Sequence, residues 1–399
     1  MNTMTSDPDR TLGAGAVAMP SSSSLSSSAP SSAQLADPVP RQPVPARASI
    51  ADVRETLRAA GAGPVHERHL MQQWLQARAL DAPYRGDPNF LPRRVREALP
   101  AIEHRLGALA CVRERAPGEG AERLLVGLAD GQTVESVLLP RGGLCVSSQI
   151  GCAVGCTFCT TGRDGLLRQL GSAEIVAQVA LARRLRAVRK VVFMGMGEPA
   201  HNLDAVLDAI ALLGTDGGIA REQLVFSTVG DRRAFERLPQ APVRPSLALS
   251  LHTTRADLRE RLLPRAPRIA PDELVELADT AARASGFPLL VQWTLLDGVN
   301  DGDDEVEALA ALLAGRRAIL NAIPWNAVEG SDFARPPLER AVAFVRGLRA
   351  RGTMATLRWS AAQEVDGGCG QLRARRAAGG SPATAPVALP ATTRLNRAG

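Results

Sequence analysis

Short apolar runs alternate with longer amphipathic segments along the chain from Leu144 to Trp359. A strand buried on both faces is a continuous apolar run, and an amphipathic segment between two such runs is typical of a helix that crosses over a parallel sheet. The alternation therefore predicts an α/β fold with one parallel sheet, either a barrel or a doubly wound sheet. The predicted strands are 144–148, 191–195, 224–228, 247–251, 289–296, 318–323 and 354–359, and the predicted helices are 172–186, 202–213, 272–284, 303–314 and 338–349.

Other patterns flank this predicted domain, 144–372. Apolar residues recur at helical spacing over 49–107, which predicts a small helical accessory domain. Residues 108–143 have β-type runs, with two strands across an Ala-Asp-Gly turn, and predict a β-hairpin that leads into the sheet. The ends, 1–48 and 373–399, are rich in small residues and proline, and we expect disordered tails because such segments bury too little apolar surface to fold.

Composition limits the compartment and the partner. The chain has 47 basic and 41 acidic residues, a formal net charge of +6, and Lys190 is its only lysine. Arginine suits phosphate groups, but richness in arginine, alanine and proline also fits a biased genome, so an RNA-like partner is only weakly indicated. No apolar run is long enough to span a membrane and no secretory signal precedes the fold, which predicts a cytoplasmic protein without a membrane partner.

Polar residues follow the predicted strands at their carboxyl ends. In a parallel sheet these ends meet at one edge, where ligands bind, so we expect one active site there. The candidates are Cys152, Cys156, Cys159, Gly197, Glu198, Ser227, Ser250, His252, Asp297, Asn300 and Asn326.

Cys152, Cys156 and Cys159 form a C-x3-C-x2-C motif after the first predicted strand of the sheet. Six cysteines are too few for a secreted disulfide framework, so metal binding or catalysis is the better interpretation. Three thiolates at this spacing hold three corners of a 4Fe-4S cluster and leave one iron open. A closed zinc site completed by Cys145, or inert cysteines, are the alternatives.

Several motifs in a fixed order carry a family resemblance. The chain resembles the radical S-adenosylmethionine (SAM) enzymes that methylate carbon 2 of adenine in ribosomal and transfer RNA, and the match covers about 50–372. The resemblance implies a partial (β/α)6-type barrel, a 4Fe-4S cluster on the three cysteines, SAM, an RNA substrate, a reductant such as flavodoxin and a monomer. The motifs are CVSSQIGCAVGCTFCTTG, GMGEP at 195–199, SLH at 250–252, LLDGVND, PWN at 324–326 and CGQL at 369–372.

The resemblance also assigns roles by position. Cys369 would carry the one-carbon unit as an S-methyl group, Glu135 would be the general base, and Cys145 would attack Cys369 to form a transient disulfide that releases methylated RNA. The cysteine thiol would accept a methyl from one SAM, and radical chemistry on a second SAM would join that carbon to adenine. The residues assigned to SAM binding are Gly197, Glu198, Ser227, Ser250, Leu251, His252 and Asn326.

The sequence departs from the family before Cys369. Trp359 and Ala361 stand where basic residues are usual, which puts the RNA target in question, and Gly367 and Gly368 are expected to loosen the loop. Three alternatives stay open: methylation at carbon 8, against which Pro199 and Trp325 count; a radical enzyme with a small-molecule or protein substrate; and a non-catalytic zinc RNA-binding protein.

Overall fold

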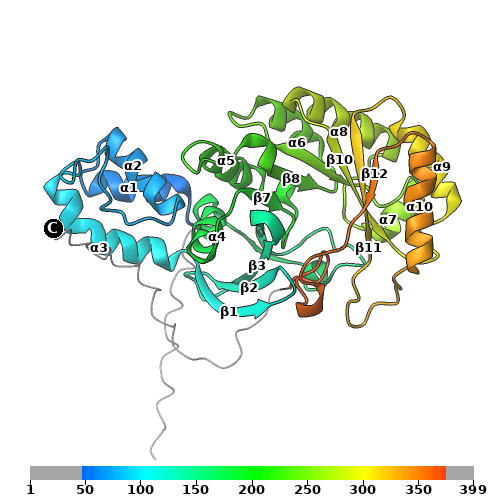
Figure 1. Ribbon diagram of the computed structural model, residues 1–399, viewed down its shortest axis with the longest axis horizontal. Helices are drawn as coiled ribbons and strands as arrows, with labels where there is room; N and C mark the ends of the chain where they lie inside the picture. Colours follow the sequence, from blue (N-terminus) through cyan, green and yellow to red (C-terminus); the bar gives the residue numbers. More distant parts are fainter. Residues whose placement is uncertain (1–46, 374–399) are drawn as a thin grey trace, which may run out of the picture. The chain divides into compact units, whose positions relative to one another are not determined.

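The described residues of the computed structural model are 47–373, so the two predicted tails lie almost wholly outside them. Ten strands form one sheet in the order β1-β2-β3-β4-β7-β8-β9-β10-β11-β12. From β4 onward each neighbouring pair is parallel, and helices α5, α6, α8, α9 and α10 lie along the outer side of the sheet (Figure 1). The strands follow the order of the chain and β1 and β12 are the edges, so the α/β fold with a partial barrel is confirmed.

The parallel part of the sheet has the seven strands and the five crossover helices that the alternation predicts, and two short helices, 232–237 and 256–262, that it did not predict. Its strands are β4 (Gly143–Cys145), β7 (Lys190–Phe193), β8 (Leu224–Thr228), β9 (Ser246–Ser250), β10 (Leu289–Leu295), β11 (Ala318–Pro324) and β12 (Ala355–Leu357). Its helices are α4 (Ser172–Leu185), α5 (Leu203–Gly214), α6 (Arg232–Arg237), α7 (Ala256–Leu262), α8 (Pro271–Ser285), α9 (Asp303–Leu313) and α10 (Leu338–Ala350).

Helix α8 shows why these segments fold as crossovers. Proline at its first position and acidic Asp272 and Glu273 in its first turn favour a helix start. Leu274, Val275 and the alanines of its inner face are buried, and the helix packs on β9 and β10. The strands it covers are buried in turn: every residue of β8 is buried, as a central strand with two covered faces requires.

Three helices precede the sheet: α1 (Ile50–Ala59), α2 (Pro64–Leu75) and α3 (Arg93–Ala108). Ser49 caps α1 in a capping box with Asp52. The backbone N–H of Ile50 donates to Ser172 Oγ of α4 at 2.9 Å, and Arg183 of α4 donates to the carbonyl of Leu75 at 2.8 Å. The helices therefore pack against the first crossover helix, and the predicted domain boundaries stay a prediction.

The predicted hairpin is the end of a three-stranded antiparallel extension of the main sheet. Strands β1 (Cys111–Pro117), β2 (Glu122–Gly127) and β3 (Thr133–Leu139) pair in order, and β3 pairs with β4. A separate two-stranded sheet, β5 (Gln149–Gly151) and β6 (Leu166–Gln169), was not predicted, because strands this short have no readable period. The 3-10 turns are Pro140–Gly142, Thr160–Gly162, Pro199–Asn202, Arg221–Gln223, Leu238–Gln240 and Gln363–Val365.

Across 47–373, none of the helices combines the length and the apolar character that crossing a membrane would require.

Candidate active site

A pocket with about 900 Å³ of empty space opens at the carboxyl ends of the parallel strands. It joins the loop after β4 with the ends of β7 to β11 and with the segment that follows β12. Nine of the residues singled out from the sequence line it, which supports the prediction of one site at this edge. They are Cys152, Cys156, Cys159, Gly197, Glu198, Ser227, Ser250, His252 and Cys369.

The three-cysteine loop is held at both ends. Strands β5 and β6 pair across it, and Cys152 N–H donates to the Gly165 carbonyl at 2.9 Å. Burial raises the pKa of Cys152 to about 12, and burial, followed by the charges of Cys159 and Cys152, raises the pKa of Cys156, so these thiols lie near one another. A metal centre is what would hold Cys152 and Cys156 as thiolates.

The spacing of these thiols separates two metal hypotheses. Within residues 47–373, no three His, Cys, Asp or Glu side chains converge tightly enough to hold a single metal ion. A 4Fe-4S cluster is larger than a single ion and takes three thiolate ligands around it, and all three cysteines line the pocket. The residues present fit the cluster, whereas no closed single-ion site that includes Cys145 is formed among the described residues.

Gly197 and Glu198 form a tight turn after β7. Gly197 has φ +103°, and a Cβ there would lie 2.6 Å from the side chain of Gln149, so only glycine fits. Glu198 accepts hydrogen bonds from Ala200 N–H and Val229 N–H, both at 3.0 Å, and burial raises its pKa. A carboxylate has about four acceptor positions, so this one retains capacity for an ammonium group of a ligand.

His252 is a neutral hydrogen-bond donor at the pocket wall. Its Nδ1 accepts from Thr294 N–H at 3.0 Å, so the proton of the neutral ring is on Nε2. Burial, and then the charge of Arg259, lower its pKa to about 3. Phe158 packs edge-on against the ring, and the hydroxyls of Ser227 and Ser250 lie 3.5 Å apart on the neighbouring strands.

Leu251 is fully buried and does not line the pocket, although it was assigned to SAM binding. Its backbone is held by Arg259, which sequence reasoning missed. The buried guanidinium donates to the carbonyls of Ser250, Leu251 and Val229, and burial lowers its pKa to about 10, so it stays charged at neutral pH. The only local signal was its position beside Leu258 and Leu262 on the inner face of a short helix.

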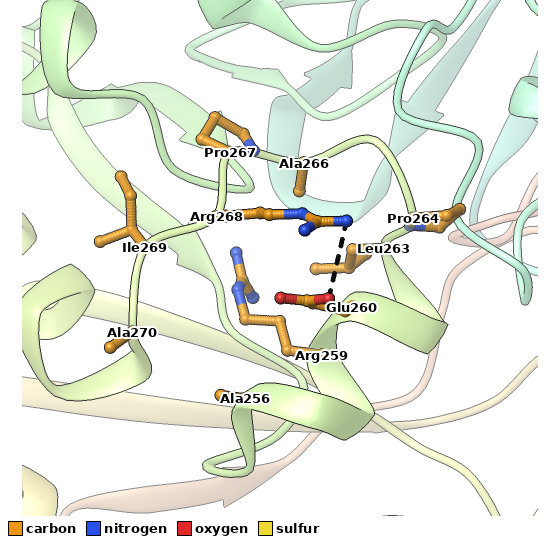
Figure 2. A pocket seen from close by; sticks show the side chains of 10 residues that line it. All are labelled: Ala256, Arg259, Glu260, Leu263, Pro264, Ala266, Pro267, Arg268, Ile269 and Ala270. Carbon is orange, nitrogen blue, oxygen red and sulfur yellow. Dashed lines mark ion pairs between the residues drawn. The ribbon is translucent and has the colours of Figure 1, made fainter.

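On its other side Arg259 borders a second cavity. Figure 2 shows Arg259 beside the ion pair of Arg268 and Glu260, which are 3.8 Å apart. The Arg259 Nε atom has no partner among the described residues. Arg259 is thus the wall between this cavity and the strand ends of the main pocket.

Asp297 and Asn300 do not line the pocket, contrary to expectation. Asn300 is fully buried and donates to the carbonyls of His252 and Thr294 at 2.7 and 2.8 Å. It therefore supports the strand ends from behind. An amide at a predicted strand end gave no sign of which side it would face.

The segment that carries Cys369 is fastened to the three-cysteine loop. Thr160 N–H donates to the Gly370 carbonyl at 2.7 Å, and Thr161 Oγ1 donates to the Leu372 carbonyl at 2.6 Å. Asn326 lies beneath the segment: its Nδ2 donates to the Cys369 carbonyl at 2.9 Å, and it does not line the pocket. The sequence had assigned Asn326 to the cofactor.

Gly367 and Gly368 do not loosen this loop, so that expectation was wrong. A Cβ on Gly368 would lie 2.8 Å from Asn326 Nδ2, and one on Gly367 would lie 2.8 Å from Ala362 Cβ. Gly367 N–H also donates to the Ala362 carbonyl at 2.7 Å. The glycines allow close packing.

Cys145 and Glu135 lie behind the pocket wall. Cys145 is buried at the end of β4, and burial, followed by the charge of Cys369, raises its pKa, so the two thiols are close enough to interact electrostatically. Glu135 is completely buried on β3, where it accepts from Arg123 at 2.6 Å and from Arg373 N–H at 2.9 Å. Cys111 is half-buried on edge strand β1.

Comparisons with known proteins agree with the expected radical SAM fold. The sequence model of the Radical SAM superfamily matches residues 146–313. Proteins named "Probable RNA methyltransferase" from Aromatoleum aromaticum and Methylibium petroleiphilum are 61% identical over 350 residues and 63% identical over 332 residues. These alignments cover 88% and 83% of this chain, and 99% and 94% of the relatives.

Among solved structures, a radical SAM methyltransferase from Sphaerobacter thermophilus matches with a TM-score of 0.72 and 33% identity, over 82% of this chain and 98% of that one. The superfamily match implies a 4Fe-4S cluster and SAM as cofactors, and the three-cysteine wall of the pocket fits that cluster. The chain therefore belongs to the radical SAM superfamily of enzymes, in the same family as these methyltransferases.

Proposed function

We propose that this enzyme methylates carbon 2 of adenine in ribosomal RNA, transfer RNA or both, and that Cys369 carries the carbon as an S-methyl group. The observation that carries the proposal is the meeting of Cys369 with the three cluster cysteines in one pocket, with Cys145 as its neighbour. The names of the relatives support RNA as the substrate. A flavodoxin-type reductant and a monomeric state belong to the same proposal.

The bound cluster and SAM supply a methyl group and, in a second use, a hydrogen-abstracting radical. Cys369 has to ionise to accept the methyl group. Desolvation raises its pKa, whereas a hydrogen bond with Ser360 and the charge of Arg358 lower it, so these two residues favour the thiolate. The residue as a whole is exposed.

Cys145 and Glu135 would act after the carbon has joined adenine. Cys145, as a thiolate, would attack the Cys369 sulfur: an S–S bond forms, the carbon–sulfur bond breaks with its electron pair left on the carbon, and that carbon takes up a proton to become the methyl group. The odd electron of the radical adduct would return to the cluster. Glu135 would remove the proton from the substituted ring carbon. Both of its oxygens are engaged by Arg123 and Arg373, so this role requires the 369–373 segment to move.

The test is Cys145→Ala. Hydrogen abstraction and addition precede thiol attack, so the variant should accumulate a covalent enzyme–RNA species, seen as an RNA-shifted band after denaturing electrophoresis. Cys111→Ala is the control, because that thiol is half-buried on β1 and has no part in the scheme. Normal turnover by Cys145→Ala without a shifted band would refute the assignment.

Two further measurements separate the alternatives. Mass spectrometry of adenines from a deletion strain identifies the modified carbon, which distinguishes carbon 2 from carbon 8, and the class of RNA. A Cys369→Ala variant that still yields a methylated product would favour a radical enzyme acting on another kind of substrate.

A further inference from the structure

Trp359 is an unusual surface residue in this protein. Its exposed fraction is 50%, whereas Trp74, Trp293 and Trp325 are each at most 4% exposed. An indole ring carries a large apolar area, so leaving it in water forgoes burial energy. Tryptophan at a functional edge is therefore typical of a surface that binds a partner.

Its position is beside the catalytic cysteine. Trp359 follows β12 at the carboxyl end of the sheet, and the next residue, Ser360, accepts from Asn326 Nδ2 at 2.8 Å and from Cys369 N–H at 3.4 Å. Ser360 therefore links the residue that carries the indole to the backbone of the Cys369 segment.

The ring is backed by a fixed cation. The Arg335 guanidinium stands over the indole with its carbon 5.7 Å from the ring centroid. It is held by hydrogen bonds to the Trp325 carbonyl at 2.7 Å and to Gln363 Oε1 at 2.8 Å. Arg335 therefore covers part of the indole ring. Trp359 is still 50% exposed, so a second flat group can pack on the remaining area.

We propose that Trp359, with Arg335 behind it, is a stacking platform for an unpaired nucleobase of the RNA next to the target adenine. The inference rests on the proposed function and adds a contact to it. Aromatic side chains and arginine planes are what proteins use to hold splayed bases. The positive charge of Arg335 beside the ring suits the phosphates that flank such a base.

This platform explains why the residue at 359 does not need to be basic. Stacking replaces a charge contact, because every base offers a flat face, whereas a lysine there would contact phosphate only. The alignment of the RNA on the enzyme would then depend on a base that is turned out of its own stack.

The test compares Trp359→Ala, Trp359→Phe and the control Met354→Ala in the full-length, cluster-loaded enzyme. Met354 is 60% exposed and lies at the opposite end of β12. The probe is an RNA fragment that the wild-type enzyme methylates. We measure its Kd by fluorescence anisotropy, KM and kcat, and, as a measure of the intact cofactor site, reductive SAM cleavage without RNA.

We expect Trp359→Ala to raise the Kd and KM for RNA roughly 5- to 100-fold, the effect of losing one base stack. Trp359→Phe should recover most of the affinity, and Met354→Ala should bind as the wild type does. SAM cleavage without RNA should be unchanged in all three. RNA should also quench the wild-type tryptophan fluorescence, because the other three indoles are buried, and this quenching should be lost in Trp359→Phe.

The outcomes distinguish this inference from the one beneath it. If the wild type methylates no RNA, the proposed function fails and the platform with it. If the wild type methylates RNA and Trp359→Ala binds it equally well, only the platform is overturned. Unchanged RNA binding with a lower melting temperature than that of Met354→Ala would mean that the indole packs on its own chain.

Discussion

At the scale of single residues, the pocket is built from polar groups whose partners are backbone atoms. Glu198 is held by two N–H groups, His252 by the N–H of Thr294, and Arg259 by three carbonyls. Backbone groups in a rigid sheet do not reorient, so the charges and donors of the pocket are fixed before a ligand arrives. These polar groups are buried away from water, so each would cost free energy if it lost its hydrogen-bond partner.

His252 provides a prediction about pH. Its pKa is about 3 in the folded protein and about 6.5 when unfolded, so below pH 6.5 the unfolded chain takes up a proton that the folded chain excludes. The free energy of unfolding therefore falls as pH falls, and His252 alone should remove about 2 kcal/mol between pH 7 and pH 5.

His252→Asn should reduce this loss by about that amount, ~2 kcal/mol. Asparagine tolerates the φ of +66° at this position and offers an amide oxygen to Thr294 N–H. Urea unfolding of both proteins at the two pH values measures the difference. Equal pH dependence in the two proteins would show that the ring is protonated in the fold.

At the scale of elements, the short β5–β6 hairpin positions the three-cysteine loop. It joins the two ends of the three-cysteine loop and fixes their separation. The pairing needs Gly151, whose φ is +76°, because a Cβ there would lie 2.0 Å from the Gly165 carbonyl oxygen. The hairpin thus converts a loop into a rigid ligand frame.

Gly151→Ala should open the hairpin and lower the iron content per chain after anaerobic reconstitution to less than half. Gly165→Ala is the matched control, since Gly165 has a similar φ of +71° with nothing within 4 Å of the added carbon. Both variants carry the same backbone strain, so only the steric overlap differs. Full iron loading of Gly151→Ala would show that the hairpin does not set the cysteine spacing.

At the scale of the whole molecule, the chain returns its carboxyl-terminal segment across the open edge of the pocket. The segment 369–373 is tied to the loop after β5 by Thr160 and Thr161, and to strand β3 by the bond between Arg373 N–H and Glu135. Residues from distant parts of the chain are thereby placed around one volume. The chain that forms this pocket has a formal net charge of +6.

A charged RNA interface predicts salt dependence. Each phosphate that is neutralised releases counterions, so with about three contacts the Kd for RNA should rise roughly 20-fold between about 50 and about 200 mM salt. Binding of SAM to the cluster-loaded enzyme before reduction is the control and should change far less. Salt-independent RNA affinity would contradict a phosphate-based interface.

Much of the fold was predictable because its signals are local. The strands of the parallel sheet are recognised as apolar runs, the helices by their amphipathic period, and the three-cysteine loop by the spacing of its cysteines. Gly197 was recognised from its motif, and its positive φ gives the physical reason. Arg259, Gln149 and Arg123 carried no comparable signal, because an arginine or glutamine on a helix or strand is as often solvated as buried.

By itself the sequence determined most strands and helices of the parallel sheet, but not β5, β6, α6 or α7, and which thiols can share a cluster, since period and spacing act over a few residues. Only the tertiary structure decided that the thiols of Cys145 and Cys369 lie close enough to interact electrostatically, that Glu135 accepts from Arg373 N–H, and that Asn326 supports the Cys369 segment without lining the pocket. These contacts join segments far apart in the chain. Their existence depends on how the sheet curves and how its side chains pack, and no local pattern encodes that.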